Sequence, residues 1–153
     1  AGSNVKKYNN LSVPTFTEYI EICKKYDCYA IIELKKTLTQ DSVKKVLDII
    51  KLENIQDKCL IISFDEEVLN TIRENDTSIK IGYLVKSVSQ DDIDKAINYK
   101  NCAICPKAIS EDLAKYAHKN GVQINVWTAD KYAQKAILHA TGVDYITTNI
   151  LDM

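Results

Sequence analysis

A glutamate and a lysine stand two residues apart in a short apolar segment, where they could act on the same ligand. The segment is YAIIELK, residues 29–35. In a strand, alternate residues share a face, so Glu33 and Lys35 would lie opposite Ala30, Ile32 and Leu34. The three apolar residues suit packing under helices. A carboxylate and an ammonium on an inner face are costly to bury unless they pair or bind something. The pattern indicates a ligand site or a simple structural ion pair.

Five cysteines could suggest metal or redox chemistry: Cys23, Cys28, Cys59, Cys102 and Cys105. The last two form a C-x-x-C, but it lies in an apolar run that resembles a strand, where the two sulfurs would face opposite ways. We therefore interpret the cysteines as buried structural thiols of a reducing compartment, which predicts a cytoplasmic location and leaves an upstream membrane anchor open. His118 and His139 fall within expected helices, and the sequence has no P-loop and no Ser-His-Asp pattern.

Six apolar runs, rich in isoleucine and valine, indicate parallel strands covered on both faces. They are residues 29–35, 59–65, 79–85, 101–107, 122–128 and 143–149. Helix patterns alternate with them at about 15–26, 42–53, 65–74, 90–99, 110–120 and 130–140, with Asp41, Ser89 and Ser110 among the expected caps. Polar or aromatic residues at the expected strand ends are Glu33, Lys35, Ser63, Asp65, Lys107, Asn125, Trp127, Thr128, Thr147, Thr148 and Asn149.

The regular alternation predicts an α/β fold of parallel β/α units. A leucine-rich repeat has a similar period, but its motif is absent. A doubly wound sheet usually carries glycine-rich turns after its strands, and none occurs here. The spacing favours a TIM-barrel type, yet a complete barrel has eight strands and six are visible. We expect one domain over residues 1–153, an incomplete (β/α) barrel or an open sheet, with 1–28 as a lead-in loop and helix.

Composition excludes several classes of partner. The net charge is −1, and Arg73 is the only arginine among 20 basic residues. Nucleic-acid readout favours arginine and a basic surface, so we expect no nucleic-acid partner. No apolar stretch is long enough to span a membrane.

Five segments of the chain resemble the C-terminal three quarters of the glycerophosphodiester phosphodiesterase family. They are SVPTFTEYI (12–20), IIELK (31–35), IISFD (61–65), AHKNGVQINVWTAD (117–130) and GVDYITTN (142–149). The resemblance implies a (β/α)8 barrel of which this chain carries strands three to eight. It also implies metal-dependent hydrolysis of glycerophosphodiesters to an alcohol and glycerol phosphate in the complete protein.

Three site residues are implied by that resemblance. Glu33 matches a ligand of a divalent metal, Ca²⁺ or Mg²⁺, Lys35 matches a lysine near the phosphate, and Trp127 matches an aromatic residue of the pocket. The family's final Thr-Asp is Thr148-Asn149 here, so the role of that aspartate is not carried over. In the family, the two catalytic histidines and two further metal carboxylates lie upstream of the part that this sequence resembles.

One carboxylate beside an ammonium is a poor site for Ca²⁺ or Mg²⁺, which need several oxygen ligands. We therefore expect that this chain alone holds no metal and has no phosphodiesterase activity. The alternative is a non-catalytic module of the same fold that binds a ligand or a partner. With two strands missing, both sheet edges would be open, so we also expect self-association through these edges.

Overall fold

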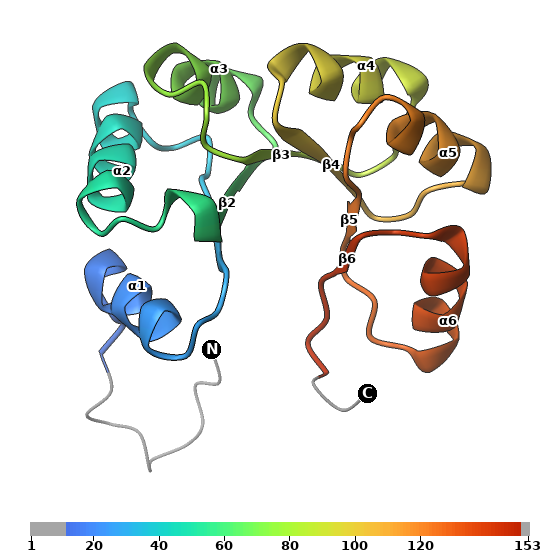
Figure 1. Cartoon of the computed structure of the whole chain (residues 1–153), viewed down its shortest axis with the longest axis horizontal. Helices are drawn as coiled ribbons and strands as arrows, with labels where there is room; N and C mark the ends of the chain where they lie inside the picture. The colour runs from blue at the N-terminus through green and yellow to red at the C-terminus, as the bar shows by residue number, and fades with distance from the viewer. Residues whose placement is uncertain (1–11, 151–153) are drawn as a thin grey trace.

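The computed structural model describes residues 12–150, and in it short strands alternate with helices (Figure 1). The strands are β1 (Ala30–Glu33), β2 (Cys59–Ser63), β3 (Ile81–Val85), β4 (Cys102–Pro106), β5 (Asn125–Val126) and β6 (Tyr145–Ile146). The helices are α1 (Phe16–Lys25), α2 (Gln40–Leu52), α3 (Glu66–Asn75), α4 (Gln90–Tyr99), α5 (Glu111–Lys119) and α6 (Tyr132–Thr141), and a short 3₁₀ helix, η2 (Gln56–Lys58), precedes β2.

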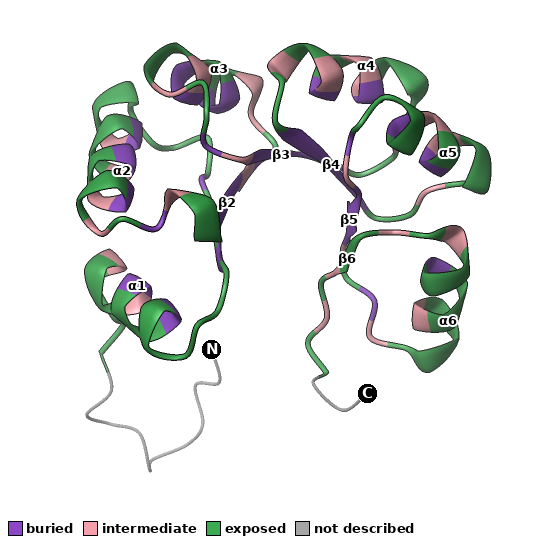
Figure 2. Cartoon of the chain, in the orientation of Figure 1, coloured by how far each residue is buried: buried purple, intermediate pink, exposed green. Residues whose placement is uncertain are grey.

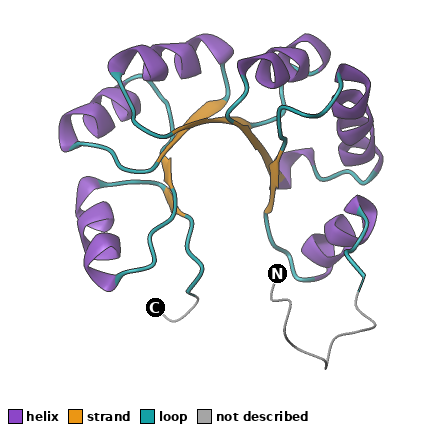
Figure 3. Ribbon diagram, turned by 180° about the vertical axis from the view of Figure 1, so that it is seen from behind, coloured by secondary structure: helices purple, strands orange, loops and turns teal. Residues whose placement is uncertain are grey.

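The strands form an open arc with the helices on its outer side (Figure 3). β1 to β4 make one parallel sheet in chain order, and β5 pairs in parallel with β6. A bridge between Ile104 and Ile124 joins the two sheets, and Trp127 N donates to Pro106 O at 3.1 Å. This arrangement confirms the predicted α/β fold, an incomplete TIM-type barrel of six parallel strands. β1 and β6 stand at its two open edges.

The last two strands are much shorter than predicted. The sequence pattern indicates strands over 122–128 and 143–149, whereas β5 and β6 have two residues each. Asp144 N and Tyr145 N both donate to Ile124 O, so the ladder begins with a shared acceptor instead of a regular register. Among the described residues β6 has a partner strand on one side only.

Two of the three predicted helix caps, Ser89 and Ser110, are confirmed. Ser89 and Ser110 accept a hydrogen bond from the backbone of the first turns of α4 and α5. The prediction of Asp41 as the cap of α2 was wrong, because α2 begins earlier and the Thr39 side chain accepts from Ser42 N. Gly142 ends α6 in the left-handed conformation, at φ 80°, which glycine adopts without strain.

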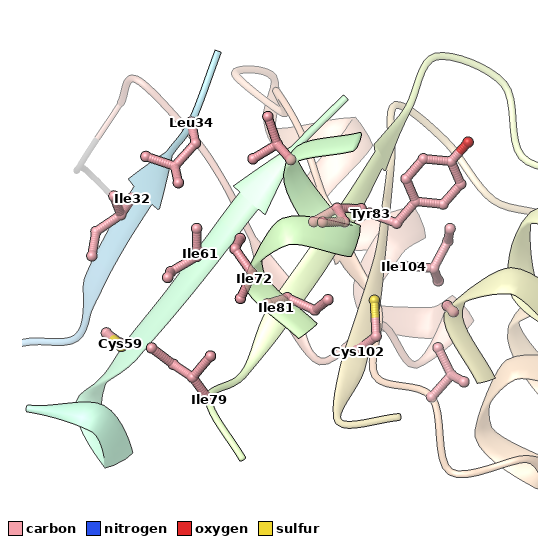
Figure 4. Close-up of a cluster of buried hydrophobic side chains, with 14 of the residues drawn as sticks. Ile32, Leu34, Cys59, Ile61, Ile72, Ile79, Ile81, Tyr83, Cys102 and Ile104 are labelled. Carbon is pink, nitrogen blue, oxygen red and sulfur yellow. The ribbon is translucent and has the colours of Figure 1, made fainter. Parts of the chain in front are cut away.

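The main core lies between the outer face of the arc and the helices (Figure 2). Ile61, Ile81 and Ile104 are fully buried on neighbouring strands, and Figure 4 shows them in one row with Ile72 of α3 nearby. A fully buried isoleucine stabilises a fold by about 1.5–3 kcal/mol. This layer therefore supplies most of the stability and holds the strand ends in place.

The inner face of the arc has a smaller apolar cluster of Leu84, Ala103 and Cys105. Gly82 lies beside it at a close approach between strands. A Cβ atom at this position would lie 2.7 Å from Cys105 Sγ and 2.9 Å from Ile62 Cγ2, closer than real side chains pack. Glycine is therefore required here by packing, which lets the strands curve without a side chain between them.

The cysteine prediction is confirmed for four residues and wrong for one. Cys102 belongs to the core under the helices and Cys105 to the inner cluster, so the C-x-x-C sulfurs do face opposite ways. Burial raises the pKa of Cys102 to about 12, which makes its thiol inert. Cys28 is exposed, because it precedes β1 in a turn whose neighbours face solvent.

The predicted lead-in of residues 1–28 is described only from residue 12 onward. There, Thr15 caps α1 in a reciprocal arrangement with Glu18. Residues 1–11 and 151–153 lie outside the described part. Within the described part, no helix has the length and apolar character needed to cross a membrane.

Candidate functional site

Glu33 and Lys35 meet at the C-terminal end of β1. Their side chains form an ion pair between Lys35 Nζ and Glu33 Oε1. The Glu33 side chain is 33% exposed and that of Lys35 67% exposed, whereas Ala30, Ile32 and Leu34 are buried. The predicted division of this strand into two faces is confirmed. The pair lies at the end of the arc where the strands have their C-terminal ends, which we call the mouth. Solvent and a ligand can both reach the pair there.

A hollow of about 410 Å³ opens beside this pair, between the ends of β1 and β2. It is lined by Glu33, Leu34, Lys35, Lys36, Thr37, Ser63, Phe64 and Asp65. Buried Ser63 fixes its floor, because its hydroxyl donates to Leu34 O at 2.7 Å and accepts from Asp65 N at 3.1 Å. The two strand ends are thus joined by one side chain, and the hollow has a defined shape.

Trp127 stands on the inner side of the mouth and is held by three contacts. Its indole Nε1 donates to Cys105 O at 2.7 Å. The ring of Phe64 meets it edge to face, with centroids 5.5 Å apart and an interplanar angle of 89°. Lys107 Nζ lies 5.6 Å from the ring centroid. These contacts fix the indole and connect it with the wall of the hollow.

Phe64 and Lys36 were missed as site residues by sequence reasoning. Phe64 is 44% exposed although it is aromatic, and Lys36 Nζ lies 3.7 Å from Asp65 Oδ2. The alternation of residues 59–65 could have indicated the position of Phe64. Because Ser63 is buried under the helices, the next side chain, Phe64, faces the inner side of the arc. Asp65 itself caps α3, since its Oδ1 accepts from Glu67 N at 2.9 Å.

The polar residues that end the last two strands mostly bond to one another. Thr147 Oγ1 donates to Asn125 Oδ1 at 3.2 Å. Asp130 accepts hydrogen bonds from the backbone and side chain of Asn149 and from the Thr148 hydroxyl, which lower the pKa of Asp130. Asn149 therefore joins the turn after β6 to the turn after β5, and the side of the mouth near β6 is polar.

The carboxylates at the mouth do not by themselves fit a divalent metal. Over residues 12–150 no group of three His, Cys, Asp or Glu side chains converges. Glu33 is already paired with Lys35, and Asp65 bonds to its own helix. His118 lies elsewhere, with Nε2 3.0 Å from Asp144 Oδ2. Ca²⁺ and Mg²⁺ need several oxygen ligands, so this donor set is insufficient.

A second cavity, of about 270 Å³, lies on the inner face near the start of the strands. Tyr29, Ile31, Leu60, Lys80 and Tyr145 are among its lining residues. Lys80 Nζ bonds to Gln123 Oε1 and lies 5.2 Å from the centroid of the Tyr145 ring. Residues of both edge strands line the cavity, and it lies at the opposite end of the strands from Glu33 and Lys35.

Comparison with known proteins shows the family to which this chain belongs. The family model of the glycerophosphoryl diester phosphodiesterase family matches residues 1–153. The chain belongs to this family. A glycerophosphodiester phosphodiesterase from Caldanaerobacter subterraneus subsp. tengcongensis is 26% identical over 148 residues, which are 94% of this chain and 61% of the relative.

Solved structures share the fold at low sequence identity. A glycerophosphodiester phosphodiesterase from Parabacteroides distasonis matches with a TM-score of 0.79 and 23% identity, over 89% of this chain and 60% of that one. An Oleispira antarctica phosphodiesterase in complex with the product sn-glycerol-3-phosphate matches with a TM-score of 0.80 and 18% identity, over 88% and 57%. The chain therefore spans well under two thirds of the length of these relatives.

Proposed function

We propose that this chain supplies part of the substrate site of a glycerophosphodiester phosphodiesterase. One observation supports this most directly: Glu33, Lys35 and Phe64 line one hollow at the strand ends, and Trp127 packs edge to face against Phe64. In β/α barrels the active site lies at this end. The Oleispira relative was solved with sn-glycerol-3-phosphate, a product of the proposed reaction.

In this proposal Lys35 places a positive charge next to the phosphate of the substrate. The Lys35 side chain is 67% exposed, and its ammonium pairs with the Glu33 carboxylate beside the hollow. Phosphate transfer develops negative charge on the phosphoryl oxygens, and a fixed cation stabilises it. Phe64 and Trp127 give an apolar wall on which the glycerol carbons can pack.

A divalent metal is part of the proposed reaction only in the complete protein. Glu33 would contribute one carboxylate, and the remaining ligands would come from residues that this chain does not hold. We accordingly expect the chain by itself to show no turnover and no tight binding of Ca²⁺ or Mg²⁺. The proton transfers would also depend on residues that this chain does not hold, because neither His118 nor His139 lies at a strand end.

A chimera tests this proposal. The part of the Caldanaerobacter relative that carries the first two β/α units is placed before residue 1, and release of glycerol phosphate from glycerophosphocholine is measured with Ca²⁺ or Mg²⁺. We expect turnover in the chimera and none in the chain alone. A folded chimera without turnover would contradict the proposal, as would turnover by the chain alone that copurifies with it.

The second candidate is a binding module of the same fold without catalysis. The observation in its favour is the existing ion pair, which already neutralises Glu33. This candidate predicts that the folded chimera binds sn-glycerol 3-phosphate yet releases none from any diester. Binding and turnover measured on the same sample therefore separate the two functions.

A further inference from the structure

The mouth carries two lysines that have no acidic partner within residues 12–150. Lys35 pairs with Glu33, and Lys36 lies near Asp65. By contrast, Lys107 lies over the Trp127 ring, and among the described residues no ion pair involves Lys86 or Lys107. The mouth of β1 to β4 therefore has an excess of two positive charges, although the whole chain has a net charge of −1.

These two lysines lie across the mouth from the Glu33–Lys35 pair. Lys86 follows β3 and Lys107 follows β4, the central strands of the arc, whereas Glu33 ends the edge strand β1. On β3, Leu84 belongs to the inner cluster, and the exposed Lys86 follows directly after the last residue of the strand, Val85. Neighbouring strands are about 4.8 Å apart, which puts these positions about 10 to 14 Å from β1 along the sheet. A phosphate beside Lys35 would reach them only through one of its two substituents.

Lys107 also changes what the aromatic pair can bind. An exposed tryptophan beside a phenylalanine is a common site for a quaternary ammonium group. Here the Trp127 ring already has the Lys107 ammonium 5.6 Å from its centroid, and its Nε1 is bonded to Cys105 O. A second cation at this ring would lose the best contact and would be repelled by Lys107.

We propose that the substrates of this site are glycerophosphodiesters whose alcohol group is anionic or a polyol, and not choline-like cations. This inference rests on the proposed function and names its substrate class. The Lys86 and Lys107 ammonium groups bind the substituent that extends from the phosphate toward β3 and β4. Exposed ion pairs of this kind change affinity by a factor of about two to five each.

The test uses the single tryptophan, Trp127, as the reporter of binding to the chain. Its fluorescence is followed in titrations with glycerophosphoinositol 4-phosphate, glycerophosphoinositol and glycerophosphocholine, with calorimetry as a second readout. We expect affinity to fall in that order, by about fivefold or more from first to last. Raising the salt concentration should reduce the difference, because the contacts are exposed charges.

Variants assign the preference to the two lysines. Lys86→Gln with Lys107→Gln should reduce the preference to less than about twofold. Lys45→Gln, which removes one charge from an exposed position on α2, should leave it unchanged. Equal affinity for the three diesters, or a preference that persists in the folded double variant, would overturn the inference and leave the proposed function standing. If neither the diesters nor sn-glycerol 3-phosphate binds to the chain, this inference fails, whereas the proposed function is judged separately by turnover in the chimera.

Discussion

The Glu33–Lys35 pair allows a sharp distinction between a functional and a structural role. If the pair only stabilised the fold, its removal would lower stability and leave turnover per folded molecule intact. The two side chains are 33% and 67% exposed, and such exposed pairs are worth about 0.2–1 kcal/mol. We therefore expect Glu33→Gln and Lys35→Met to lower the free energy of unfolding by less than about 1 kcal/mol.

The expected loss of activity is much larger than this loss of stability. A fixed charge that stabilises a phosphoryl transition state contributes about 3 kcal/mol, which corresponds to roughly a hundredfold in rate. In the chimera described above, Lys35→Met should lower kcat/KM by roughly a hundredfold or more. Glu33→Gln should nearly abolish turnover, since it removes the one mouth glutamate that the family resemblance assigns to the metal.

The assay pairs urea unfolding with turnover for each variant. Glu53→Gln is the matched control, because Glu53 is also a partly exposed carboxylate paired with a lysine, Lys24, at 3.0 Å, and it lies at the other end of the barrel. We expect this control to retain turnover with a similar small loss of stability. Near-normal turnover in folded Glu33→Gln would refute the assignment of Glu33 to the site.

Four further predictions concern the fold that holds the site. The Arg73 side chain donates hydrogen bonds to five backbone carbonyl oxygens, those of Asp76, Ile79, Tyr99, Lys100 and Asn101. Arg73→Met should therefore lower the free energy of unfolding by about 3–4 kcal/mol in urea titrations, and Arg73→Lys by about half as much. Gly82→Ala should cost about 1–3 kcal/mol in the same assay, because the new methyl group collides with Cys105 and Ile62. Burial opposes the ionisation of Asp76, but hydrogen bonds from Ile79 and Ser78 lower its pKa from 3.8 to about 2. The ionised carboxylate therefore stabilises the fold by about 2 kcal/mol above pH 4, and this stabilisation is lost as the pH falls toward 2. In urea titrations, the difference in the free energy of unfolding between wild type and Asp76→Asn should shrink over this range. The free edges of β1 and β6 should cause self-association, so light scattering should show dimers or larger species that increase with concentration, and a monomer at high concentration would contradict this.

Local sequence determined the elements and their faces. The alternation in 29–35 placed Glu33 and Lys35 opposite the buried residues, because a strand directs neighbouring side chains to opposite sides whatever its surroundings. The caps Ser89 and Ser110 follow from the same local logic, since a serine hydroxyl bonds within its own first turn. The C-x-x-C geometry was predictable for this reason as well.

Only the tertiary structure decided which side chains meet. Phe64, Lys107 and Trp127 follow or end three different strands, and their contacts depend on the register between strands and on the curvature of the arc. No local pattern encodes these quantities. The same cause explains the wrong predictions. The lengths of β5 and β6 depend on the pairing between strands, and the start of α2 at Gln40, capped by Thr39 and not by Asp41, depends on the turn after β1. The sequence pointed to Glu33, Lys35 and Trp127, whereas Phe64 and Lys36 were recognised only in the packed sheet, since distance in space between strand ends is set by packing and not by spacing along the chain.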